Sequence, residues 1–279
     1  FITCYSIILM YLILPLFPEF KSVFPSFTND AGLLVRNYIF TFHFEDHIAG
    51  SKRNTGIFRE MGVFQFHINL AIIFLWFTSY QKEYKIIISF ILILGLITTF
   101  SSTGYLTFII ILIALTFKKK DFIIKKTNIC NLILIILLIF GISVFMSVFA
   151  QHIYTTIEKI SVGSSSFDGR LASIIANIKS WKNAPIFGHG IRNADVYAYE
   201  GYLKNFTEHN TSTSTSFFSF YGVVPGILFI WFIFLFVKQL KQNFIITLLI
   251  FVSIIFSINS QRFNFDQFFY ILLFTTFMN

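Results

Sequence analysis

Long apolar runs alternate with short polar connections along almost the whole chain. Eight of these runs, taken with their flanking residues, have the composition of membrane-spanning helices; they lie at about Ile2–Phe17, Val63–Ser79, Lys85–Phe100, Gly104–Phe117, Ile129–Ala150, Phe217–Val237, Phe244–Ile258 and Phe265–Met278. The composition agrees, since 56% of the residues are hydrophobic, only 12% are charged and the mean hydropathy is +0.74. The pattern predicts an all-α, polytopic membrane protein with about eight transmembrane helices in this fragment, folded as a single membrane domain over residues 1–279.

The chain begins at Phe1 rather than Met and shows no signal peptide, so we expect it to be N-terminally truncated. Its two cysteines, Cys4 and Cys130, lie in or beside apolar runs and have neither disulfide nor metal-ligand spacing. The cysteines therefore indicate no metal site. We also expect no cofactor. The net charge of +8 comes from scattered basic residues, which suits membrane orientation and does not indicate a nucleic-acid partner.

The short connections predict the orientation in the membrane. Lysines gather in three of them, near residues 82–85, 118–126 and 238–241, and the positive-inside rule makes that face cytoplasmic. Phe1 is then expected on the cytoplasmic side. The segment 21–62 faces outward, and so does 151–215, a large extracytoplasmic loop with short amphipathic helices.

All six arginines fall on the outer face in this topology, at Arg36, Arg53, Arg59, Arg170, Arg192 and Arg262. Arginine binds phosphate through forked, bidentate hydrogen bonds, whereas lysine provides a point charge. This segregation predicts an anionic ligand at the outer face. Chance segregation in a small sample is the alternative.

The first outer segment ends with three ionisable residues just ahead of a predicted span. Arg53, Arg59 and Glu60 either belong to a polar site or form an interfacial anchor in which arginine and glutamate pair. Upstream, His43 and His47 are four residues apart and would share a face only if that piece is helical. A solvated loop is the preferred interpretation for the two histidines.

The large outer loop contains an amphipathic helix, predicted over Asp168–Trp181 with Asp168 as its N-cap. Its apolar stripe consists of Leu171, Ile174, Ile175, Ile178 and Trp181. Arg170, Ser173 and Asn177 follow one edge of that stripe. We expect the stripe to rest on the membrane domain or in the interface plane, with Arg170 at the seam; the alternative is that Arg170 only reaches lipid phosphate.

Turn residues and short polar runs follow this helix. Gly188 and Gly190 allow a sharp turn in which backbone N–H groups could converge on an anion. His209 and Asn210 then precede a Ser/Thr run that opens the next apolar run, and glycine and proline at 222–226 predict a kink in it. Earlier in the chain, residues 101–103 are predicted to cap a helix or to line a cavity.

Four segments together resemble a known family. They are RNTGIFREMG (Arg53–Gly62), TFSSTGYLTFIIILIAL (Thr99–Leu115), GRLASIIANIKSWKNAPIFGHGI (Gly169–Ile191) and HNTSTSTSFFSFYGVVPGILF (His209–Phe229). In this order the chain is similar to the O-antigen polymerase/ligase superfamily of bacterial envelope glycan assembly, which includes the Wzy-type polymerases and the O-antigen ligases. It departs from the family pattern where Met61 replaces a proline and where Ser102–Thr103 replaces a common arginine.

The resemblance implies a metal-independent glycosyltransferase whose donor is a glycan on a polyprenyl diphosphate. It implies His209 as general base and Arg170 as the cation that stabilises the leaving diphosphate. The remaining substrate-binding candidates are Arg53, Arg59, Glu60, Arg192, Trp181, Gly188, Gly190 and Asn210. Trp181 could stack on a sugar, although its place in the apolar stripe favours packing.

The function expected from the resemblance is a polymerase that joins lipid-linked repeat units into O-antigen or capsule. The alternatives are a ligase that moves the finished glycan to lipid A core or protein, and a non-enzymatic transporter or flippase of lipid-linked sugars. A transporter is expected to have its charges near mid-membrane, whereas these lie in outer loops. The implied location is the bacterial inner membrane with the site facing the periplasm, and the implied partners are membrane lipids, a flippase and a chain-length regulator.

Overall fold

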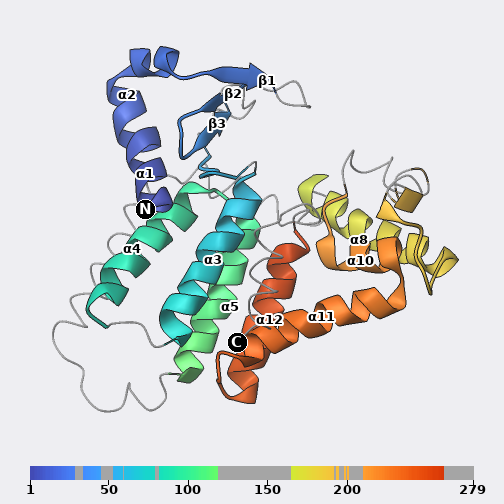
Figure 1. The fold of residues 1–279 in the computed structure, drawn as a ribbon. Coiled ribbons are helices and arrows are strands. Elements are labelled where there is room, and N and C mark those ends of the chain that lie inside the picture. Colours follow the sequence, from blue (N-terminus) through green and yellow to red (C-terminus); the bar gives the residue numbers. More distant parts are fainter. Residues whose placement is uncertain are drawn as a thin grey trace.

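The computed structural model describes residues 1–28, 34–44, 53–58, 60–78, 82–118, 165–191, 193–194, 198, 200 and 210–260. Within these residues the chain is mostly helical, as predicted (Figure 1). The helices are α1 (Ile2–Ile8), the π-helix η1 (Leu9–Ile13), α2 (Leu14–Leu16), the 3₁₀-helix η2 (Pro18–Val23), α3 (Met61–Phe77), α4 (Lys82–Thr98), α5 (Ser102–Lys118), α8 (Ser165–Asn183), α10 (Thr213–Tyr221), α11 (Val223–Lys238) and α12 (Phe244–Ile258).

The apolar runs were a good guide to where helices form. The predicted spans at 63–79, 85–100, 104–117 and 244–258 coincide with α3, α4, α5 and α12, and their ends differ by three residues or fewer. The run at 217–237 is divided into α10 and α11 at Gly222, where φ is +87° and the predicted kink occurs. The predicted spans at 129–150 and 265–278 lie outside the described residues. None of the helices in the described part is both long enough and apolar enough to cross a membrane.

A small sheet corrects the all-α prediction. Strands β1 (Ser26–Thr28), β2 (Leu34–Asn37) and β3 (Phe42–Phe44) form an antiparallel sheet in that order. Phe42, His43 and Phe44 of β3 alternate between aromatic and polar, which favours a strand, but the segment was predicted to be part of an outer loop. Because His43 lies on β3, the helical face that would pair it with His47 does not form.

The first predicted span, 2–17, is helical and packs against the end of α4. Thr3 lies against Gly95 of α4, where a Cβ on the glycine would be only 2.1 Å from the Thr3 methyl group. Asn54 links the two helices, since its side-chain amide donates to Ser6 (2.9 Å) and to Thr98 (3.0 Å). The predicted span 2–17 therefore begins beside the last turns of α4 and continues past its end (Figure 1).

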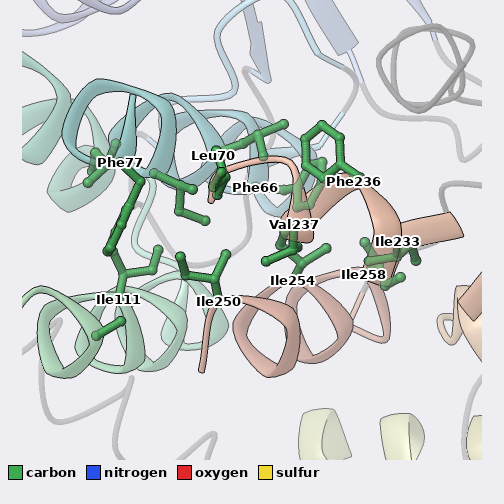
Figure 2. Packing of buried hydrophobic residues seen from close by; sticks show 14 of the residues in the cluster. Phe66, Leu70, Phe77, Ile111, Ile233, Phe236, Val237, Ile250, Ile254 and Ile258 are labelled. Carbon is green, nitrogen blue, oxygen red and sulfur yellow. The ribbon is translucent and has the colours of Figure 1, made fainter. Parts of the chain in front are cut away.

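The main core lies where α3, α5, α11 and α12 pack together. The core includes Phe66 of α3, Ile111 of α5, Ile233 of α11 and Ile250 of α12, all of them buried, and Figure 2 shows these side chains between the helices. Helices in lipid associate through close packing of this kind rather than through exclusion of water. The core holds α5 in place and so fixes where its two ends lie.

Polar side chains join three of these helices at the beginning of α5. The Gln65 amide donates to Ser257 of α12 (3.1 Å), and the Asn69 amide donates to Gln65 (3.0 Å) and to the Gly104 carbonyl of α5 (3.2 Å). Gly104 allows this approach, because a Cβ there would lie 3.0 Å from Gln65. Buried hydrogen bonds between helices fix their register, so the first turn of α5 has a defined position.

Candidate functional site

The candidate site is built around the first turn of α5. A tight turn precedes it, in which Phe100 has a φ of +47°. Ser101 then caps the helix, as predicted for this segment, because its hydroxyl accepts a hydrogen bond from the Gly104 N–H (3.3 Å). The first N–H groups of a helix carry a partial positive charge, which makes such an end attractive to anions.

Arg170 of α8 reaches this turn. Its Nη1 atom donates a hydrogen bond to Thr103 Oγ1 at 2.7 Å. The guanidinium is partly buried, and this burial lowers the pKa of Arg170 from its ordinary value. Within the described residues the pKa of Arg170 is not affected by any acidic group. A buried cation is thus held at the positive end of a helix, an arrangement that an anionic ligand would stabilise.

Arg53 approaches α5 from another segment. Its neighbour Asn54 donates its backbone N–H to the Thr98 carbonyl at the end of α4 (2.9 Å). The Arg53 side chain interacts electrostatically with Tyr105, and burial lowers the pKa of Arg53. Its Nε atom is buried without a hydrogen-bond partner in the described part of the chain. Two arginines from separate segments therefore lie near the beginning of one helix.

Lysine occupies the opposite end of α5. Lys118, the last residue of the helix, donates to the Trp76 carbonyl of α3 (2.7 Å) and lies over the Phe77 ring (5.0 Å). Thr103 and Lys118 are about 22 Å apart along the helix, from its rise per residue. Arg170 and Arg53 therefore lie near one end of α5 and Lys118 at the other, while the predicted orientation in the membrane stays a prediction.

The face of α8 that carries Arg170 packs on the segment around α10. Asn177 and Asn210 form a reciprocal amide pair with distances of 3.1 and 2.7 Å. Asn177 also donates to Thr215 (2.9 Å), and Ser173 accepts a hydrogen bond from the Thr211 N–H (3.2 Å). Asn210 is therefore fixed on the same helix face as Arg170, about 10 Å along α8 from it.

The packing of α8 corrects two details of the prediction. The helix begins at Ser165, so Asp168 lies in its first turn and is not the N-cap. The side that packs on α10 consists mainly of small and polar residues, such as Asn177 and Ser180, and Trp181 is the residue of the apolar stripe that contacts α10. Leu171 and Ile178 of that stripe are exposed. That the stripe lies in the plane of the membrane interface stays a prediction.

The glycine turn after α8 is used for packing. Gly188 and Gly190 have φ values of +65° and +74°. However, the N–H of Gly188 donates to the Ala184 carbonyl (3.0 Å) and the N–H of Gly190 to the Phe220 carbonyl (2.9 Å). This corrects the prediction that these N–H groups converge on an anion, because they are already paired with the protein.

Trp181 also has a packing role here. Its ring makes an edge contact with Phe218, with centroids 5.5 Å apart, and its Nε1 donates to the Pro185 carbonyl (3.0 Å). These contacts hold the end of α8 against α10. The prediction that Trp181 stacks on a sugar is not supported by this geometry, because the indole is engaged within the protein.

Other candidates fall at the edge of the site or outside the described part. Glu60 is the N-cap residue of α3 without a capping bond from its side chain. Arg59, Arg192 and His209 lie outside the described residues. Asn210, which follows His209 in the sequence, donates a hydrogen bond to Asn177 of α8.

Comparison with known proteins adds a family to this geometry. Residues 87–224 match the model of the family described as O-antigen ligase. This region belongs to the O-antigen ligase family. The matched residues include Thr103, Arg170, Asn177 and Asn210. Arg53 precedes them. No curated protein and no solved structure matches the chain.

Membership of the O-antigen ligase family gives the class of activity. Its members are glycan-transferring enzymes of the ligase or polymerase type that act on lipid-linked glycans, which implies a part in polysaccharide and lipopolysaccharide biosynthesis. They are integral proteins of the inner membrane. The family predicted from the four sequence segments is therefore confirmed.

Three residues that organise the site were not among the predicted site residues. Two lie in the region that matches the O-antigen ligase family, and one precedes it. Thr103 receives Arg170, Asn177 holds Asn210, and Asn54 fixes the segment that carries Arg53. For Asn177 a signal was present, because small and polar residues at helical spacing on α8 match the Ser/Thr run that begins at Thr211. Thr103 was predicted only to cap a helix or to line a cavity, and Asn54 carries no signal without knowledge of what lies opposite it.

Proposed function

We propose that this protein is a polymerase that joins polyprenyl-diphosphate-linked oligosaccharide units into a surface polysaccharide on the outer side of the inner membrane. The observation that carries the proposal is the partly buried guanidinium of Arg170, bonded to Thr103 at the beginning of α5. Two arginines and a helix N-terminus suit a ligand with concentrated negative charge. The diphosphate of a lipid-linked glycan has that charge.

In the proposed reaction a hydroxyl oxygen of the acceptor sugar attacks the anomeric carbon of the donor. The bond between that carbon and the diphosphate oxygen breaks, and the lipid diphosphate leaves with the bonding electrons. The hydroxyl proton passes to His209, since a neutral imidazole is a suitable general base near pH 7. Asn210 follows His209 directly and would fix the chain that carries it.

The leaving diphosphate develops negative charge as the bond breaks. Arg170 and Arg53 would stabilise that charge, with Arg59 and Arg192 as further candidate cations. Fixed guanidinium groups supply this stabilisation without a metal ion, so the proposed transfer is metal-independent. Glu60 would contribute to substrate binding from the start of α3. A flippase that delivers the donor and a chain-length regulator are the proposed partners.

A ligase is the second candidate, because the matching family is described as O-antigen ligase. Ligase and polymerase use the same donor chemistry and differ in the acceptor. In the ligase case the acceptor hydroxyl belongs to lipid A core or to a protein. In the polymerase case it belongs to another lipid-linked unit.

The test is a set of variants expressed in the native cell, followed by gel analysis of the surface glycan. We expect His209→Ala and Arg170→Ala to abolish long chains, with partial recovery for Arg170→Lys because lysine keeps the charge but loses the forked contact. Asn183→Ala, exposed at the end of the same helix, is the matched control. Attachment of a single unit identifies a polymerase, whereas unattached polymer on the lipid carrier identifies a ligase. Normal ladders at normal protein levels in both alanine variants would refute the proposed site.

A further inference from the structure

The turn between α8 and the α10–α11 pair presents two large apolar side chains to its surroundings. Ile186 is 62% exposed and Phe187 is 85% exposed. Two adjacent large apolar side chains with this exposure are uncommon in a turn that contacts only water. They raise the question of what covers them.

The backbone of this turn is held firmly, so the exposure does not come from a loose loop. His189 donates its N–H to the Ser219 carbonyl (2.9 Å), and Val223 donates to the Pro185 carbonyl (2.9 Å). Gly222 leaves room for the turn, because a Cβ there would lie 1.9 Å from the Ile186 carbonyl oxygen. The two apolar side chains are therefore presented in a fixed direction.

The exposed turn continues into a larger apolar surface. Its partner Val223 is the first residue of α11, and Val224, Ile227 and Trp231 are exposed along that helix. Beside them lies an open groove of about 380 Å³, lined by Phe218, Ile227, Ile230, Trp231, Phe234 and Phe251. A helix of this composition in an inner-membrane protein family adjoins acyl chains.

Basic residues flank this surface on the side of α8. Lys179 and Lys182 are exposed in the last turns of the helix, close in sequence to the apolar turn. Lysines beside exposed apolar residues are typical of segments in the membrane interface, because the ammonium group reaches lipid phosphates while the apolar residues enter the acyl region. Phospholipid satisfies both kinds of side chain.

We propose that Ile186 and Phe187 insert into the bilayer at the boundary between headgroups and acyl chains, with Lys179 and Lys182 at the lipid phosphates. The insertion depth expected for such segments is roughly 5–10 Å. The turn then anchors the end of α8 at a fixed height on the membrane. This inference does not depend on whether the enzyme is a polymerase or a ligase.

The test uses spin labels on the full chain in nanodiscs of phosphatidylcholine and phosphatidylglycerol. Cys4 and Cys130 are replaced by serine, and single cysteines are introduced as Phe187→Cys and, as the matched polar control, Asn183→Cys. We expect the label at 187 to collide often with oxygen and several-fold less often with a water-soluble nickel complex than the label at 183. Only a label in the acyl region gives this combination.

Two outcomes would overturn the proposal. Equal access of the nickel complex to both sites would place the turn in water. Low access of both reagents at 187 would mean that protein covers it, from this chain or from a second copy. Should the cysteine variant not fold, Phe187→Trp keeps an aromatic ring, and brominated lipids are expected to quench more of its fluorescence than they quench in the parent. Unchanged quenching would also refute insertion.

Discussion

The core around α12 and the contact between α8 and α10 are built from different side chains. In the core, Ile233 and Ile250 are enclosed by other aliphatic and aromatic groups. Between α8 and α10 many of the buried residues are small or polar. A single side chain, Asn177, donates to both Asn210 and Thr215. Apolar packing depends on volume, whereas hydrogen bonds depend on register and direction. The core is therefore a platform, and the α8–α10 contact determines where Arg170 points.

The strongest test of this comparison is Asn177→Leu, which keeps the branched shape of the side chain but removes the amide. The buried Asn210 amide nitrogen loses its acceptor, which costs about 1–3 kcal/mol, and the hydrogen bond from Asn177 to Thr215 is lost as well, at about 1 kcal/mol. We therefore expect a loss of up to about 4 kcal/mol in local stability. Hydrogen exchange should speed up in α8 and α10 but not in α12. Ile178→Leu, on the exposed side of α8, is the control. Unchanged exchange in α8 would mean that the polar pair does not hold the contact.

Ile250→Ala tests the core. It removes a fully buried side chain at the contact of α12 with α5, and we expect a loss of about 3 kcal/mol through the cavity it leaves. Thermal unfolding in detergent measures the loss. Leu248→Ala on the exposed side of the same helix should change little. Equal effects of the two variants would show that α12 is not packed as in Figure 2.

Gly222→Ala tests the junction between the two regions. The new methyl group would meet the Ile186 carbonyl, and the positive φ adds strain, so we expect a loss of about 2 kcal/mol or more. Gly190→Ala is the matched control, because it has a φ of +74° but no atom within 4 Å of the new Cβ. A comparison of their unfolding temperatures separates the clash from the strain. Identical temperatures would exclude the close contact at residue 222.

Ser219→Ala is expected to have the smallest effect. It removes one hydrogen bond, from Ser219 Oγ to Ser180 Oγ at 2.7 Å. A single neutral bond contributes about 1 kcal/mol, and we expect that loss in the same exchange measurement. A loss as large as that of Asn177→Leu would mean that the contribution of a side chain to the α8–α10 contact does not increase with the number of its hydrogen bonds.

The sequence predicted the helices of the core better than their contacts. Apolar runs reveal α3, α5 and α12 because a helix must satisfy its own backbone in an apolar setting. For α8 the apolar stripe did not identify the residues that bind α10 through hydrogen bonds. In the structure Leu171 is exposed and Ser173 is buried. The packing face depends on the Ser/Thr composition of α10, which lies far along the chain.

The candidate site shows the same limit. Arg170 and Arg53 stand out in the sequence because arginine is rare and segregated. Their meeting at the beginning of α5 depends on contacts between distant segments, namely the bond to Thr103 and the clamp at Asn54. The strands at 26–44 were missed for a related reason, because three short strands pair only with each other and carry a weak pattern.

The clamp at Asn54 has a consequence for how an anion would meet Arg53. Asn54 is fully buried, bonds two helices and accepts a hydrogen bond from the Gly56 N–H (3.0 Å). The backbone beside Arg53 therefore gives up its conformational freedom during folding and not at the moment of ligand capture. A ligand that arrives there needs to order only one long side chain.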